Sequence, residues 1–139
     1  LTTLHDVRNV LHAYSQYPRG AIKLFFTANH DENSWNGTEY EKYGIAALAW
    51  AVFAFTWHGM PMVYSGQESP SKKRLKFFDK DLINWNNPSQ LHGFYQKLSL
   101  LRANNPAIFK GESFILSSDK FPSCFNKTTS SLVSCFVSL

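Results

Sequence analysis

Apolar residues recur every three or four positions at the start of the chain, which predicts an amphipathic helix over residues 3–16. The apolar positions of this helix are Leu4, Val7, Leu11 and Tyr14. Pro18 and Gly20 come next and end it. The next apolar run, residues 21–26, lies between Gly20 and a polar cluster. This pattern predicts a short buried strand that delivers polar side chains to its C-terminal end.

A second helix is expected over residues 38–57. Thr38 and Glu41 have the spacing of a capping box, which marks its start. Residues 45–55 are apolar on almost every face, so this part of the helix must be packed on several sides. Gly59 ends the helix, and a second apolar strand comes after it. Strand, helix and strand in this length predict a βαβ unit whose two strands are parallel neighbours.

Three consecutive polar residues, Asn29, His30 and Asp31, come directly after the first strand. In parallel α/β barrels the C-terminal ends of the strands carry the active site. These three residues are therefore candidates for chemistry, although a solvent-exposed Asx turn explains such a cluster as well when it is taken alone.

The second half of the chain predicts a long loop, one more helix and an incomplete sheet. The loop covers residues 65–87, and Asn87-Pro88 has the pattern of an N-cap followed by proline at the first helical position. The helix should end near Asn104, before Pro106. Beyond Gly111 short β-like runs predict antiparallel strands over residues 114–116, 124–125 and 132–137.

The composition narrows the class of protein. Hydrophobic residues make up 44% and charged residues 17% of the 139 residues, as in an ordinary folded domain. The net charge of +4 includes one short basic cluster at residues 72–76, which lacks the length and motifs of a nucleic-acid site. Residues 44–67 carry no Asp, Glu, Lys or Arg, but Gly59 and Pro61 interrupt them, so a helix and a strand are expected rather than a membrane span.

Two motifs together carry a family resemblance. FTANHDENSWNGTEYEKYG (26–44) and GMPMVYSGQE (59–68) resemble the last part of the catalytic barrel in the α-amylase family of glycoside hydrolases, family thirteen. RLKFFDKDLINW (74–85) is similar to the segment after barrel strand eight in bacterial starch-degrading members. The resemblance implies that residues 1–110 form the last two strands and helices of a TIM (β/α)8 barrel. Residues 111–139 would then begin a Greek-key C-terminal β-domain that is truncated here.

The resemblance also implies roles for individual residues. Members of the family cleave or transfer α-glucosidic bonds with retention, which requires a nucleophile and an acid/base about 5 Å apart. The family supplies both from barrel strands upstream of this stretch. A third carboxylate, which stabilises the transition state, maps onto Asp31. His30 is expected to donate to the same sugar, and Asn29 belongs to the substrate-binding segment, where it would orient the loop.

Other candidate residues keep two interpretations. Trp35 either stacks on a sugar or anchors its loop. Glu68 invites comparison with a catalytic acid, but the resemblance assigns it to structure. A salt-bridge or helix-capping role is expected for Asp79 and Asp81, and a cation site is the alternative. Substrate contact is a further option for Lys73 and Arg74. The remaining histidines show no ligand spacing and are expected to be structural: His5, His12, His58 and His92.

The two cysteines do not have metal-ligand spacing. Cys124 and Cys135 either meet across adjacent antiparallel strands or remain free thiols, and the sequence leaves their disulfide state open.

The expected function is therefore part of a retaining α-glucan hydrolase that cleaves α-1,4 bonds of starch or maltooligosaccharides. Its partners would be the glucan and the rest of its own catalytic domain, with no cofactor in this segment and a structural calcium ion as an option in the full-length enzyme. The chain alone is expected to be inactive. The alternatives are a related α-glucosidase or transglycosylase, and a non-catalytic amylase-like domain for carbohydrate binding or assembly. An enzyme that degrades starch polymers would be exported, whereas one that acts on short oligosaccharides need not be.

Overall fold

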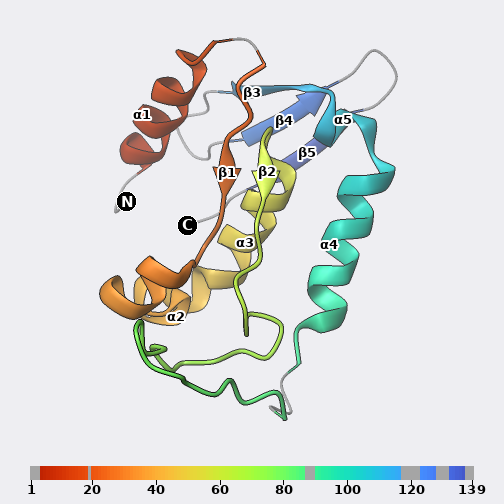
Figure 1. Cartoon of the computed structure of the whole chain (residues 1–139). Helices are drawn as coiled ribbons and strands as arrows, with labels where there is room; N and C mark the ends of the chain where they lie inside the picture. The colour runs from red at the N-terminus through yellow and green to blue at the C-terminus, as the bar shows by residue number, and fades with distance from the viewer. Residues whose placement is uncertain (1–3, 19, 87–89, 117–122, 128–131, 137–139) are drawn as a thin grey trace.

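The computed structural model describes residues 4–18, 20–86, 90–116, 123–127 and 132–136 (Figure 1). The helical elements, in chain order, are α1 (Leu4–Ser15), the π-helical turn η1 (Glu32–Asn36), α2 (Glu39–Tyr43), the 3-10 turn η2 (Gly44–Ala46), α3 (Ala47–Thr56), α4 (His92–Asn104) and α5 (Pro106–Phe109). The strands are β1 (Leu24–Phe25), β2 (Met60–Pro61), β3 (Glu112–Leu116), β4 (Ser123–Lys127) and β5 (Leu132–Phe136).

The predicted βαβ unit is confirmed, with β1 and β2 side by side and parallel (Figure 1). Leu24 pairs with Met60, and Phe25 pairs with Pro61. The amide of Met60 donates to the Lys23 carbonyl at 2.7 Å, and the amide of Met62 donates to the Phe25 carbonyl at 2.8 Å. The helical segment between the two strands is long enough to form the crossover connection that neighbouring parallel strands require.

The strands are shorter and more exposed than the apolar runs predicted. The prediction of a buried strand over residues 21–26 was wrong, because only Leu24–Phe25 is regular strand, and Ile22 is 69% and Leu24 49% exposed. Side chains alternate between the two faces of a strand, so helices on one face cover only half of them. The described residues place no third strand beside β1 and β2.

The single helix predicted over residues 38–57 was also wrong in detail, because it is divided into α2, η2 and α3. Its start is confirmed: Thr38 Oγ1 accepts from the Glu41 amide, and the Glu41 carboxylate accepts from the Thr38 amide. The break falls at Gly44, whose φ of 55° and ψ of −129° are not helical. Glycine adopts a positive φ without steric cost, so the chain turns there.

Helix α3 lies at the centre of the fold, which explains why it is apolar on most faces. On one side Phe53 and Trp57 pack with Leu11 of α1. On the other side Ala51 and Phe55 form a second cluster, completed by Tyr95 and Leu98 of α4. The helix is therefore packed between α1 and α4, as the sequence required.

Hydrogen bonds from the side chain of Arg102 hold α4 against the C-terminal end of α3. The Arg102 guanidinium donates to the carbonyls of Phe55 at 3.0 Å and Trp57 at 3.2 Å, and also to that of Gly59. Burial lowers the pKa of Arg102. A cation at this position satisfies carbonyls that the end of a helix leaves without partners. The predicted cap at Asn87-Pro88 lies outside the described residues, and α4 itself begins at His92.

The C-terminal part forms the predicted antiparallel sheet, in the order β3-β4-β5, and it packs against α5. Cys124 and Cys135 are opposite each other in the register of β4 and β5. The option that the two cysteines meet across adjacent strands is thus confirmed at the level of the backbone. Among the described residues, none of the helices has both the length and the apolar character needed to cross a membrane.

Candidate functional site

His30 and Asp31 lie just after β1, at the C-terminal end of the parallel strand pair. His30 Nε2 and Asp31 Oδ2 are 3.5 Å apart, and both side chains are mostly exposed. An imidazole and a carboxylate at this distance together present hydrogen-bond donors and acceptors to a polar ligand. The structure therefore brings together the two residues that the sequence placed at the centre of the site.

Asn29 shapes the turn that carries this pair. Its Oδ1 accepts from the Glu32 amide at 2.7 Å, and its carbonyl accepts from the Asn33 amide at 2.9 Å. Residues 29–37, for which the sequence predicts a loop, contain the helical turn η1 (Glu32–Asn36), so the prediction of an irregular loop is wrong there. An asparagine that caps a turn through its own side chain gives the backbone this start.

A buried network of polar groups joins the ends of the two strands. Gln67, which lies beyond β2, donates from Nε2 to Thr27 Oγ1 at 2.7 Å and to Glu39 Oε2 at 2.5 Å. Thr27 donates to the same Glu39 oxygen at 2.8 Å. Gln67 Oε1 accepts from the Tyr64 amide at 2.6 Å. All three network side chains are buried, so each needs these partners.

Two tyrosines surround this network. Burial, followed by the charge of Glu39, raises the pKa of Tyr40 to about 12. Burial also raises the pKa of Tyr95, whose hydroxyl lies 3.4 Å from Gln67 Nε2. Both hydroxyls therefore stay protonated at ordinary pH. The Tyr40 hydroxyl hydrogen-bonds to Glu39, and the Tyr95 hydroxyl accepts from Gln67 Nε2. Sequence reasoning gave no role to Thr27 and Glu39, although both stand in the stretch 26–44, because only the fold brings them to Gln67.

The long loop after β2 is held against η1. The Leu75 amide donates to Asn33 Oδ1 at 2.7 Å, and the Leu75 carbonyl accepts from Ser34 Oγ at 2.7 Å. The expected salt-bridge role of the loop aspartates is confirmed, because Asp81 pairs with Lys73 and Asp79 pairs with Lys76. Lys73 lowers the pKa of Asp81. The backbone of Glu68 also anchors the loop, since its carbonyl accepts from the Leu91 amide at 2.7 Å.

Arg74 forms a second attachment of the loop. Its Nε donates to both carboxylate oxygens of Glu41, at 3.1 and 3.0 Å. This contact, with the hydrogen bond from Thr38, lowers the pKa of Glu41 from 4.5 to about 2. A carboxylate whose pKa is lowered by folding stabilises the folded form above its ordinary pKa. We therefore expect this attachment to be complete above pH 4.5 and to be lost as the pH falls toward 2.

The measurement is the ¹⁵N chemical shift of Arg74 Nε in the full-length protein as a function of pH. It should stay constant from pH 7 to about 4 and change only as the pH approaches 2. Glu41→Gln should abolish this change, whereas Glu32→Gln is a matched control that should leave it intact. Glu32 pairs with Lys42 at 3.0 Å on the same segment. A midpoint near 4.5 at Arg74 would show that the two side chains are not paired.

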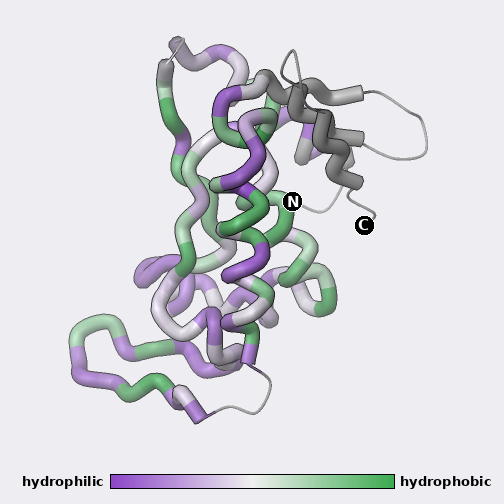
Figure 2. Tube along the Cα trace, turned by 90° about the vertical axis from the view of Figure 1, so that its right-hand side faces the viewer, coloured by the Kyte–Doolittle hydropathy of each residue, from purple (hydrophilic) through white to green (hydrophobic). Residues whose placement is uncertain are grey.

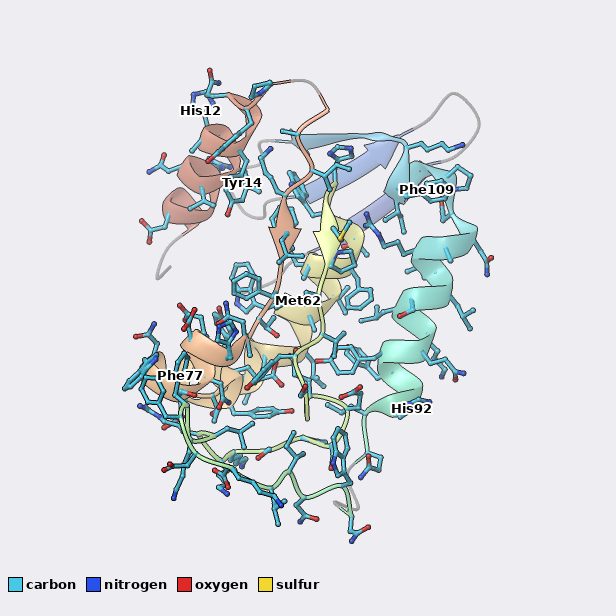
Figure 3. All side chains as sticks on the ribbon, viewed as in Figure 1. His12, Tyr14, Met62, Phe77, His92 and Phe109 are labelled. Atoms are coloured by element: carbon cyan, nitrogen blue, oxygen red, sulfur yellow. The ribbon has the colours of Figure 1, made fainter. Side chains whose placement is uncertain are left out.

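Trp35 lies in an aromatic cluster that the sequence did not predict. Its ring centroid is 5.4 Å from that of Phe77 and 6.3 Å from that of Phe78, both on the long loop. The His30 ring is 5.7 Å from Phe77. Figure 3 shows Phe77 beside the segment that comes after β1. Both phenylalanines stand in the stretch 74–85, but no local signal distinguishes them from core residues.

Within the described residues, no three His, Cys, Asp or Glu side chains gather in a way that could hold a metal ion. The structural calcium ion that the resemblance implies as an option for the full-length enzyme stays a prediction. His12, His58 and His92 are exposed, and the side chain of His5 lies outside the described residues. Figure 3 shows His12 on α1 and His92 at the start of α4.

Comparison with solved structures identifies the fold. A maltogenic α-amylase from Thermotoga neapolitana matches 94% of this chain with a TM-score of 0.77 and 23% identity. An α-amylase from Lactobacillus plantarum matches 96% with a TM-score of 0.77 and 18% identity. This chain has the fold of part of an α-amylase. A cyclic α-maltosyl-(1→6)-maltose hydrolase from Arthrobacter globiformis also matches, over 91% of the chain, with a TM-score of 0.65 and 23% identity.

The amylase-like fold is partial with respect to these structures. The chain covers 31% of the first two and 30% of the third, so it spans about a third of their length. No protein-family model matches the chain, and no curated protein sequence matches it. The similarity is therefore one of structure, at identities that establish the fold and leave the activity to be argued from the site.

Proposed function

We propose that this chain is part of the catalytic domain of a retaining α-glucan hydrolase that cleaves α-1,4-glucosidic bonds of starch or maltooligosaccharides. Residues 1–110 would form the last two strands and helices of its (β/α)8 barrel. Residues 111–139 would begin its C-terminal β-domain. The observation that carries the proposal is the exposed His30–Asp31 pair at the C-terminal end of a parallel strand, in a chain with an α-amylase fold.

Asp31 is assigned the stabilisation of the transition state. As the glycosidic bond breaks, the sugar ring flattens toward an oxocarbenium ion and develops positive charge. A carboxylate that binds the hydroxyls of this distorted ring interacts more strongly with the transition state than with the substrate, so it lowers the barrier without forming a covalent bond. His30 would donate to the same sugar. The nucleophile and the acid/base would come from other strands of the barrel.

The stereochemistry of the product tests this proposal. We expect ¹H NMR of maltoheptaose incubated with the full-length protein to show the α-anomer of the new reducing end first, before mutarotation produces the β-anomer. The 139-residue chain alone, at the same concentration, should release no product. Initial formation of the β-anomer would exclude the retaining route. Glucan binding without any hydrolysis would support a non-catalytic carbohydrate-binding domain instead.

A further inference from the structure

Three aromatic rings gather on the surface next to the His30–Asp31 pair. Besides their contacts with Trp35, Phe77 and Phe78 lie with ring centroids 4.8 Å apart at an interplanar angle of 73°. Through His30, whose ring contacts Phe77, this group is continuous with the candidate site. We name Trp35, Phe77 and Phe78 the aromatic surface.

The rings of the aromatic surface keep much of their area open to solvent. Phe78 is 85% exposed, Trp35 59% and Phe77 38%. None of them belongs to either hydrophobic cluster around α3. Figure 2 shows apolar stretches between hydrophilic ones along the long loop, at the end of the molecule away from α5. Exposed aromatic residues that pack on one another and not on the core commonly mark a binding site.

The backbone that carries these rings is fixed before any ligand arrives. Leu75, two residues before Phe77, is bonded through both its amide and its carbonyl to the η1 turn that carries Trp35. Arg74 is held by Glu41. A backbone held in this way at Leu75 loses little conformational freedom when a ligand stacks on the nearby rings.

The chemistry around the rings favours a sugar as the ligand. Glu32, three residues before Trp35, pairs with Lys42 at 3.0 Å and accepts from Asn36 at 3.1 Å. A pyranose has an apolar CH face and a rim of hydroxyls, so it matches flat rings that are bordered by polar groups.

We propose that the aromatic surface holds a glucosyl unit of an α-glucan next to the unit that His30 and Asp31 bind. This inference rests on the proposed function, because that function supplies the glucan and places its reacting unit at Asp31. It adds Phe77 and Phe78 as residues that determine affinity for chains longer than the reacting unit. Stacking on their open faces contributes binding and no bond-breaking step.

The test is calorimetric titration of full-length protein in an Asp31→Asn background, with maltoheptaose as the probe. Phe78→Ala is the sharpest variant, because this side chain is the most exposed of the three and its removal disturbs the fold least. We expect it to weaken the Kd about tenfold. Phe77→Ala is a second ring variant, and Phe109→Ala is its matched control. Phe109 is 39% exposed, close to the 38% of Phe77, and lies at the opposite end of the molecule (Figure 3). Phe109→Ala should leave the Kd unchanged.

Replacements at Trp35 separate stacking from packing. Trp35→Phe keeps a flat ring and should bind within about threefold of the parent, whereas Trp35→Leu keeps an apolar side chain without a ring and should lose about tenfold. The proposal would be overturned if Trp35→Phe and Trp35→Leu lost the same amount of affinity. It would also be overturned if every ring variant bound maltoheptaose with the same Kd as Phe109→Ala.

The same experiments distinguish this inference from the proposed function. If glucan binding depends on the rings but the parent protein hydrolyses nothing, the aromatic surface is a sugar-binding site and the proposed hydrolase function is wrong. If the protein hydrolyses glucan with retention but its Kd does not depend on the three rings, the hydrolase function holds and the aromatic surface does not bind sugar.

Discussion

Asp31→Asn in the full-length protein should lower kcat for maltoheptaose about 10³-fold, the effect expected when one preorganised electrostatic contact to the transition state is lost. Asparagine keeps the size of the side chain and removes its charge. The carboxylate is assigned to the distorted sugar ring, where positive charge develops, so the loss should appear in kcat more than in KM. The measurement is steady-state release of reducing ends at saturating maltoheptaose.

Asp79→Asn is the matched control. The Asp79 side chain is 72% exposed against 59% for Asp31, and it pairs with Lys76 on the surface. The same change of charge there should leave kcat within about twofold of the parent, because a surface ion pair contributes little. Circular dichroism of both variants should match the parent. If Asp31→Asn retained the kcat of Asp79→Asn, Asp31 would have no part in the chemistry.

The parts of the fold that local signals specify were predictable. The capping box at Thr38 and Glu41 marked a helix start, and it is present as such. The apolar residues of α3 required packing on several sides, and two clusters provide it. The break at Gly44 was missed because a glycine inside a helical pattern is usually tolerated, and only the backbone angles there show that the chain turns.

The candidate site was predictable only where its residues are contiguous. Asn29, His30 and Asp31 are consecutive in the sequence, so predicting their position after β1 required only that the end of one strand be placed correctly. Phe77 comes to Trp35 from 42 positions along the chain, through contacts between a loop and a turn that no periodicity describes. The buried partner of Gln67, Glu39, resembled an ordinary acidic residue in the first turn of a helix, where such residues favour the helix dipole.

Gln67→Leu should strongly destabilise the fold. It removes the donor to Glu39 and Thr27 and the acceptor for the Tyr64 amide, all at once and in a buried setting. Leucine has about the same size, so the cost comes from polar groups left without partners. We expect a loss of about 3 kcal/mol in the free energy of unfolding. A thermal melt should register this as a decrease in Tm on the order of 10 °C.

Gln16→Leu provides the matched control, because Gln16 is exposed and its side chain donates to the equally exposed Ser15 hydroxyl, so Tm should hardly change.

Thr27 lies four residues before Asp31, so the network also fixes where the His30–Asp31 pair emerges from β1. Gln67→Leu should therefore lose activity at temperatures well below its Tm, as a positioning residue would. Unchanged Tm would show that the strand ends are held by packing alone. A lower Tm with full activity in the cold would show that the network stabilises the fold without positioning Asp31.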